Sequence, residues 1–355
     1  MNEDQRTLGL SVEVSGCAGK CIHCWAQGRP YPQIKLGDIE RILEEGARFC
    51  QSQGLKFSPY PMHEVLMHTD ALRVLQLFDT YCHPIDPITT PGPALALRED
   101  WEELLSGAKD LGTTALWFAF HGLDEIQDRA IGRKGAFAEA ITAIERGKSA
   151  GFRCGANVFI TTDNLHQIPQ MMGLFSSVGL DSLSIEPAGY RPHPRGREYY
   201  SLRPELAQLI PYAGMFAEES SWHKEAWRDL DKCTEAYYVD QALSNQGSEE
   251  VKWSYFNPNA TELVCRNNLD LHTGYAGTYG PLHGNLGRDD MQATFGKALK
   301  AGPLRFERLY FPEGDIPPVP ELARRWGDPK GQRVYMSAVD VRLRWLDLEL
   351  GGAVK

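Results

Sequence analysis

Cysteine is scarce in this chain, and long apolar runs are missing. Eight cysteines among 355 residues are too few for a small scaffold held together by disulfides. Residues 1–10 contain no apolar secretory core. No apolar run approaches the ~20 residues that cross a bilayer. We therefore expect a chain with no membrane partner that resides in the reducing cytoplasm.

Positive charge is also in short supply. The chain has 37 Lys and Arg against 47 Asp and Glu, a formal net charge of −10. Proteins that bind nucleic acid through its backbone rely on an excess of basic side chains. We therefore expect no nucleic-acid partner. The length allows one large domain, or one domain and a smaller one.

Three of the cysteines stand close together. Cys17, Cys21 and Cys24 form C-x-x-x-C-x-x-C in SGCAGKCIHCWAQGR, behind the apolar, β-prone run Leu8–Val14. Three thiolates can hold three irons of a [4Fe–4S] cube and leave the fourth iron open, because a fully protein-bound cube needs a fourth cysteine. A structural zinc site with His23 as fourth ligand is the alternative. Zinc ligands usually come as two separated pairs, and the chain has no second C-x-x-C.

The hydrophobic pattern alternates β-like runs with amphipathic helices, which is typical of a parallel α/β sheet. The candidate strands are 8–14, 55–60, 86–90, 114–121, 153–161 and 182–187. Six β/α units within residues 1–190 are too few for an eightfold barrel and predict a partial (β/α)6 TIM-like barrel. After a Pro/Arg-rich connector, residues 204–355 are expected to form an α+β extension that covers the substrate.

The cysteine spacing after a first strand resembles the radical S-adenosylmethionine (AdoMet) superfamily. In that family the open iron chelates AdoMet, and an electron from the cluster releases a 5′-deoxyadenosyl radical. The segment from Trp117 to Gln170 (WFAFHGLDEIQDRAIGRKG and onward) is similar to the SPASM-bearing branch. The resemblance implies one [4Fe–4S] cluster on Cys17, Cys21 and Cys24, bound AdoMet, and an electron donor such as flavodoxin or ferredoxin.

The resemblance also implies a set of AdoMet-binding residues. His23 precedes the third cysteine, where an aromatic residue packs on adenine in the family; a solvent-facing loop histidine is the alternative. Met62, His63 and Glu64 stand where the family has a Gly-Gly-Glu-Pro turn, and only Glu64 matches, as an acceptor for the AdoMet ammonium. Asn157 could reach the ribose or the carboxylate of AdoMet. Alternatively, its side chain could hydrogen-bond to nearby backbone groups.

Two residues at expected strand ends are candidates for contact with substrate. His121 replaces the aspartate of the family's S-L-D-G motif, and an imidazole can act as acid, base or donor near neutral pH. Alternatively, the His121 side chain could only fill space at the open end of the barrel. Glu186 could bind a substrate amine or hydroxyl. The alternative for Glu186 is a salt bridge to Arg191, Arg195 or Arg197.

The C-terminal part is informative through its missing cysteines. SPASM domains bind auxiliary clusters through a run of cysteines, but none follows Cys265, and Tyr279 takes the place of the second one. We therefore expect a degenerate, cysteine-poor SPASM-like region without a thiolate-bound auxiliary cluster. Cys265 could supply a hydrogen atom to a substrate radical, or could be a packed residue. The scattered cysteines 50, 82, 154 and 233 are expected to be buried.

Without an auxiliary cluster a redox-neutral reaction is easier than a net oxidation. We expect a radical AdoMet enzyme that abstracts hydrogen from a polar small molecule, such as a sugar or aminocyclitol, and that epimerises, rearranges or eliminates. A peptide- or protein-modifying maturase is the first alternative. Because the cysteine motif begins at residue 17, we expect no fused leader-binding domain. A non-catalytic metal-binding interaction module is the second alternative.

Overall fold

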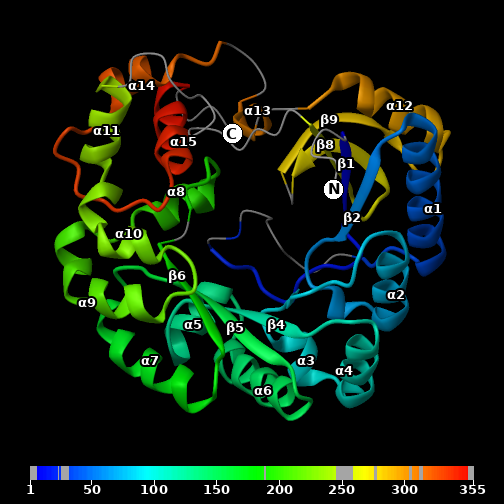
Figure 1. The fold of residues 1–355 in the computed structure, drawn as a ribbon, viewed down its shortest axis with the longest axis horizontal. Helices are drawn as coiled ribbons and strands as arrows, with labels where there is room; N and C mark the ends of the chain where they lie inside the picture. Colours follow the sequence, from blue (N-terminus) through cyan, green and yellow to red (C-terminus); the bar gives the residue numbers. More distant parts are fainter. Residues whose placement is uncertain are drawn as a thin grey trace.

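The computed structural model describes residues 6–22, 24, 32–187, 189–244, 259–275, 278–303, 306–311 and 315–350. All six expected strands are present. They are β1 (Thr7–Val12), β2 (Lys56–Pro61), β3 (Ile88–Thr89), β4 (Ala115–Phe120), β5 (Arg153–Phe159) and β6 (Ser182–Glu186). Helices follow them around the outside, and the sheets surround the middle of the molecule (Figure 1). This arrangement confirms the predicted α/β partial barrel.

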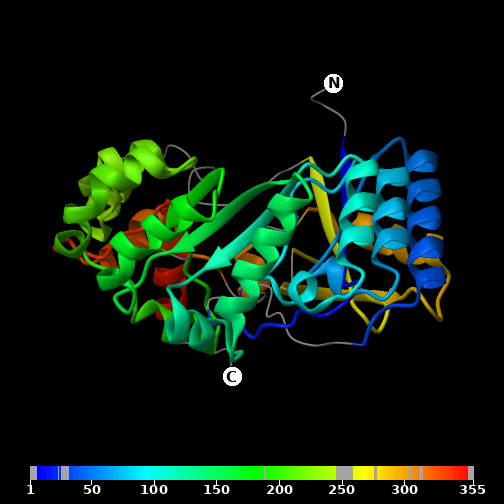
Figure 2. The ribbon, with the colours of Figure 1, turned by 90° about the horizontal axis from the view of Figure 1, so that it is seen from below.

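The strands form two sheets. One is wholly parallel, in the order β3-β4-β5-β6. In the other, β1 lies between β2 and β7 (Ala260–Cys265) and is parallel to both. The antiparallel strands β8 (Asp270–Tyr275) and β9 (Thr278–Asn285) extend this sheet. A hairpin from the C-terminal part of the chain therefore lies beside the strand that leads into the cysteine motif (Figure 2).

Alternate residues of each strand face the helices or the barrel interior. In β4, Leu116, Phe118 and Phe120 are fully buried in the main hydrophobic core. The core-facing side of β1 is equally apolar, with Leu8, Leu10 and Val12. The opposite faces carry the polar and aromatic side chains described below.

The helices that cover the barrel come in sequence order between the strands. They are α1 (Leu36–Gln53), α2 (Ala71–Tyr81), α3 (Pro93–Leu97), α4 (Trp101–Asp110), α5 (Asp124–Ile131), α6 (Ala136–Ser149) and α7 (Ile168–Ser177). Gly54 ends α1 in the left-handed conformation at φ 64°, as its position predicts. The short helices α3 and α5 were not expected from the sequence.

The C-terminal part is mostly helical. Its helices are α8 (Pro194–Tyr200), α9 (Leu206–Glu219), α10 (Lys224–Arg228), α11 (Glu235–Ser244), α12 (Met291–Ala301), α13 (Phe306–Tyr310), α14 (Val319–Trp326) and α15 (Ala338–Glu349). α12 packs against α1. A second core, separate from the main one, forms around Trp345, Tyr335 and Leu322.

The four scattered cysteines differ in burial. Cys50, Cys154 and Cys233 are buried as expected, whereas Cys82 at the end of α2 is only half-buried, which corrects that prediction. No helix within the described ranges has both the length and the apolar character needed to span a bilayer.

Candidate functional site

The cysteine loop follows β1 directly and is held by backbone hydrogen bonds. Lys20 N–H donates to the carbonyl of Ile131 at 2.7 Å, and Ile22 N–H donates to that of Ala130 at 3.0 Å. Both carbonyls lie at the C-terminal end of α5, whose last carbonyls have no partner within the helix. The Cys24 amide donates to the Cys21 carbonyl at 3.1 Å. The end of α5 therefore fixes the path of the loop.

The thiols in this loop are half-buried and close enough to affect one another. Burial, and then the nearby Glu64 carboxyl, raises the pKa of Cys17 to about 12. Burial and the other two cysteines raise the pKa of Cys21 as well. Without a cation these thiols stay protonated, and bound iron would stabilise them as thiolates. Three such donors suit the three irons of an open cube.

The zinc alternative depends on His23, which lies outside the described residues. Among the residues that the structure does describe, no three His, Cys, Asp or Glu side chains converge as the ligands of a single metal ion. The thiolates of a cube bind different irons, so they lie further apart than the ligands of one zinc ion.

Glu64 lies beneath the cysteine loop and is 1% exposed. Its carboxylate accepts from the Thr90 hydroxyl at 2.6 Å and from the Ala94 amide at 3.4 Å. The other oxygen is 3.5 Å from the Ala18 amide, inside the cysteine motif. Burial raises the pKa of Glu64 to about 7. Glu64 therefore ties the cysteine loop to the turn after β3 through donors of the chain itself.

Met62 and His63 lie on the same turn. Met62 is buried, and its amide donates to the Val12 carbonyl at 2.7 Å. His63 adopts a left-handed backbone with φ 65°. This conformation is uncommon outside glycine, and the glycines of the family turn are missing here. The Nε2 atom of His63 lies 3.5 Å from Oε1 of Glu13.

Glu13 links this turn to the C-terminal hairpin. It is fully buried, and its carboxylate also accepts from the Tyr279 hydroxyl and from the Asn267 amide at 3.1 Å. Burial acts to raise the pKa of Glu13, but the hydrogen bonds with His63 and Tyr279 act in the opposite direction. Together they outweigh burial, so the pKa of Glu13 lies below its ordinary value. Tyr279, at the expected position of the missing cysteine, is therefore a partner of a carboxylate.

The barrel interior is lined by layers of side chains from neighbouring strands. Register places Trp117 beside Gly155, and Ala119 beside Asn157. Asn157 in turn lies beside Ser184, and Phe159 beside Glu186. The His121 ring stacks on Phe159, with centroids 4.9 Å apart and planes at 17°. Asn157 and Glu186 therefore lie on the same face of neighbouring strands, and His121 stacks beside them on Phe159. Their contacts with AdoMet and substrate stay predictions.

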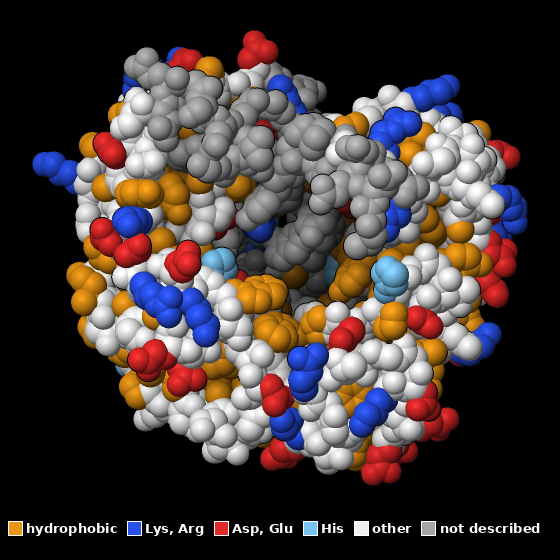
Figure 3. Space-filling model, in the orientation of Figure 1, with side chains coloured by type: hydrophobic (Ala, Val, Ile, Leu, Met, Phe, Trp, Pro, Cys, Tyr) orange, Lys and Arg blue, Asp and Glu red, His pale blue; other side chains and the backbone are white. Residues whose placement is uncertain are grey.

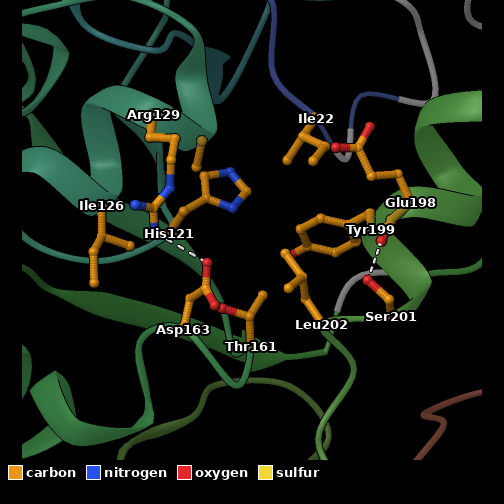
Figure 4. Close-up of a pocket in the computed structure, with 11 residues that line it drawn as sticks. Ile22, His121, Ile126, Arg129, Thr161, Asp163, Glu198, Tyr199, Ser201 and Leu202 are labelled. Carbon is orange, nitrogen blue, oxygen red and sulfur yellow. Dashed lines mark hydrogen bonds and ion pairs between the residues drawn. The ribbon is translucent and has the colours of Figure 1, made fainter.

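A cavity of about 390 Å³ opens beside His121 (Figure 4). Its apolar wall includes Ile22 of the cysteine loop, Tyr199 of α8 and Leu202. Arg129 and Asp163 form an ion pair of 3.0 Å at its rim. Because Ile22 stands between two cysteines of the motif, this cavity adjoins the cysteine loop.

Glu186 has a partner that the sequence did not indicate. Its Oε2 lies 3.2 Å from Nε2 of His223, and this hydrogen bond raises the pKa of His223. The arginines proposed as alternatives bind elsewhere. Arg191 pairs with Asp340 and Arg197 with Asp347, while Arg195 donates to the Lys20 carbonyl. The expected alternative is therefore wrong, and His223 is a site residue that the sequence analysis missed.

Cys265 lies at the end of β7 and is fully buried. It pairs with Val12, and both belong to the main hydrophobic core. Its thiol lies 3.7 Å from the Arg266 carbonyl. The proposed hydrogen donor therefore lies on the helix-covered face of the sheet, whereas Glu13 lies on the opposite face.

Comparisons with known proteins give the same fold. Residues 14–175 match the family model of the radical SAM superfamily. A search of curated proteins gave no significant match. SuiB of Streptococcus suis bound to S-adenosylmethionine is similar in structure, with a TM-score of 0.51 and 16% identity over 82% of this chain and 66% of SuiB. The chain thus spans slightly less than two thirds of that SuiB chain.

Two further structures are similar over most of the chain. SuiB bound to its precursor peptide SuiA has a TM-score of 0.53 and 15% identity, over 95% of this chain and 76% of SuiB. Native anSMEcpe with bound AdoMet and Cp18Cys peptide has a TM-score of 0.51 and 13% identity, over 96% of both chains. At such low identity the likeness concerns the fold.

Proposed function

Through residues 14–175 the chain belongs to the radical SAM superfamily, and we propose that it abstracts a hydrogen atom from a polar small molecule with a redox-neutral outcome. The outcome is an epimerisation, a rearrangement or an elimination. The observation that carries the proposal is the cysteine loop, fixed on the end of α5 beside the interior layers of β4 to β6.

The family's cofactors are one [4Fe–4S] cluster and AdoMet, which together supply a 5′-deoxyadenosyl radical when bound. In this chain Cys17, Cys21 and Cys24 would hold the cluster. The cavity beside Ile22 and His121, with apolar and polar side chains in its wall, offers a partly enclosed place for an adenosyl group. Asn157 and Glu186, on neighbouring strands, offer polar groups within the barrel. An electron donor such as flavodoxin or ferredoxin, in a reducing cytoplasm, completes the proposal.

The redox-neutral outcome is supported by the hairpin. No cysteine follows Cys265, and the Tyr279 hydroxyl binds Glu13. The stretch after Cys265 therefore offers no thiolate ligands for a second cluster that would accept an electron. The reaction then needs no second redox centre.

A peptide-modifying maturase is the second candidate. The observation in its favour is the fold likeness to SuiB and anSMEcpe, whose structures include bound peptides. The small-molecule proposal is supported by two adjacent side chains: Trp222 stacks on Trp117 of β4, and His223 pairs with Glu186 of β6.

The test is anaerobic reconstitution with iron and sulfide, followed by reduction with AdoMet present. We expect about four irons per chain and release of 5′-deoxyadenosine. Replacement of Cys17, Cys21 and Cys24 together by Ala should abolish both, and Cys82→Ala serves as the matched control. Iron content in the triple variant equal to that of the unmodified chain would refute the cluster assignment.

A further inference from the structure

The segment Ser220–His223, between α9 and α10, is fixed to the outer edge of β6. Ser220 forms a parallel bridge with Leu183, and the Ser221 amide donates to the Leu183 carbonyl at 2.6 Å. The Ser220 hydroxyl accepts from the Ile185 amide at 3.2 Å. These contacts extend the sheet by a short piece of backbone. They hold the next two side chains, Trp222 and His223, against groups of the barrel interior.

Trp222 stacks on Trp117, with ring centroids 6.0 Å apart and planes at 20°. Trp117 faces the interior, because its neighbours Leu116 and Phe118 face the helix-covered core. It lies over Gly155, where an added Cβ would be 2.2 Å from the indole. Trp222 is 61% exposed although it is one of the largest apolar side chains. The Trp117 indole is therefore packed against the strand, while much of the Trp222 indole remains open to a ligand. A hollow lies at the centre of the molecule in the view of Figure 3.

Polar groups lie beside the indoles in the same wall. Glu186 and His223 form the 3.2 Å pair, and their side chains are 27% and 32% exposed, so both are accessible. Ser184 lies on β6 two residues before Glu186, on the same face, and pairs with Asn157 of β5. Its hydroxyl is buried and has no hydrogen-bond partner within the described part of the chain. A wall with an exposed indole face, an accessible carboxylate and an accessible imidazole suits a polar ligand that carries a ring.

We infer that this wall, resting on the proposed function, recognises a ring-bearing polyol with an amino group, an amino sugar or aminocyclitol. The C–H face of the ring stacks on Trp222, as flat apolar surfaces do on indole. The ammonium lies toward Glu186, because the indole faces and the carboxylate both attract a cation. The accessible His223 ring binds a hydroxyl group. Trp222 and Glu186 are then specificity-determining residues.

The experiment uses the reconstituted protein with its cluster and with AdoMet present, and two probes. D-Glucosamine and D-glucose differ only in the amino group at C2. Saturation-transfer NMR reports contact with the ring protons, and a concentration series gives the Kd of each sugar. We expect D-glucosamine to bind about five- to tenfold more tightly than D-glucose.

Variants separate the two recognition elements. Trp222→Ala should weaken both sugars about five- to tenfold, and Trp222→Phe, which keeps a ring, should weaken them less. Glu186→Gln should reduce the preference for D-glucosamine to about one without changing the Kd of D-glucose more than about twofold. Trp326→Ala is the matched control, because Trp326 is another exposed tryptophan but lies on α14. Its indole N–H donates to the Glu349 carboxylate. Trp326→Ala should change neither Kd.

The outcomes are distinguishable. Absence of saturation transfer to either sugar, or transfer that Trp222→Ala leaves unchanged, would overturn the inference. So would stronger, Trp222-dependent binding of N-acetyl-lysinamide, which would indicate a peptide. Loss of iron or of 5′-deoxyadenosine release in the unmodified chain would instead reject the proposed function, and both are measured on the same samples.

Discussion

Val12 and Cys265 are neighbours across the parallel strands β1 and β7, although they are far apart in the sequence. Because paired residues in a sheet share a face, the Cys265 thiol lies on the side of Leu8 and Leu10, under the helices. Burial raises the pKa of Cys265 far above its ordinary value. The two residues thus define a packed contact that joins the start of the barrel to the C-terminal hairpin.

This contact predicts what removal of the thiol does. Cys265→Ala should leave iron content and 5′-deoxyadenosine release unchanged, and should lower the free energy of unfolding by about 1 kcal/mol because it opens a small cavity. Cys265→Ser should cost more, since it buries a hydroxyl in an apolar core. Thermal unfolding and iron analysis provide the measurement. A reaction product that takes up solvent deuterium in the unmodified chain but not in Cys265→Ala would restore the role as hydrogen donor.

Gly155 makes room for Trp117, and this gives a second prediction. A Cβ at position 155 would lie 2.2 Å from the indole, so the ring must move. Gly155→Ala should lower the free energy of unfolding by about 1–3 kcal/mol. In the background of Trp117→Leu, the same change should cost less than about 0.5 kcal/mol. Equal costs in both backgrounds, measured by urea unfolding, would show that the indole is not what occupies the space.

Much of the barrel could be predicted from the sequence, because its signals are local. Short apolar runs between segments of helical periodicity located all six strands, β1 to β6. The third strand is shorter than expected, Ile88–Thr89, because Pro87 and Pro91 flank it and lack the N–H that a ladder requires. The pairing of β7 with β1 had no local signal, since register between distant segments is set by tertiary packing.

The site was predictable where it follows from strand geometry. The carboxyl ends of parallel strands meet, and His121 and Glu186 follow or end two strands of one parallel sheet, β4 and β6. His223 was missed because it lies in a loop between two helices with neither periodicity nor a motif. Arg191 and Arg197, near Glu186 in sequence, bind Asp340 and Asp347 of α15 instead, and nothing in the sequence specifies pairs separated by so many residues.

Glu13 gives a third prediction, on the connection between barrel and hairpin. Glu13→Ala would leave the Tyr279 hydroxyl, the His63 ring and the Asn267 amide without their common acceptor. Unsatisfied buried donors are costly, so the free energy of unfolding should fall by about 2–4 kcal/mol. Glu13→Gln keeps one acceptor oxygen and should cost about half as much. Calorimetry would contradict this account if the two variants were equally stable.

His193 gives a prediction on pH. The ring caps α8 by accepting from the Gly196 amide at 3.1 Å, and burial, then nearby arginines, lowers its pKa to about 4. Between about pH 6.5 and 4 the unfolded chain binds a proton on this residue that the folded chain does not, so stability falls as the pH falls through that window. At pH 5 the loss should be about 2 kcal/mol relative to pH 7.5.

His193→Asn tests this. Asparagine also accepts from an amide at a helix start, but it does not titrate. Chemical unfolding of the reconstituted protein at pH 7.5 and at pH 5 should therefore show a smaller loss of stability in the variant, by about 2 kcal/mol. The matched control is His166→Asn, in the turn before α7, which should retain the pH dependence of the unmodified chain. If His193→Asn loses as much stability as the unmodified chain between the two pH values, the buried imidazole is not the group that titrates.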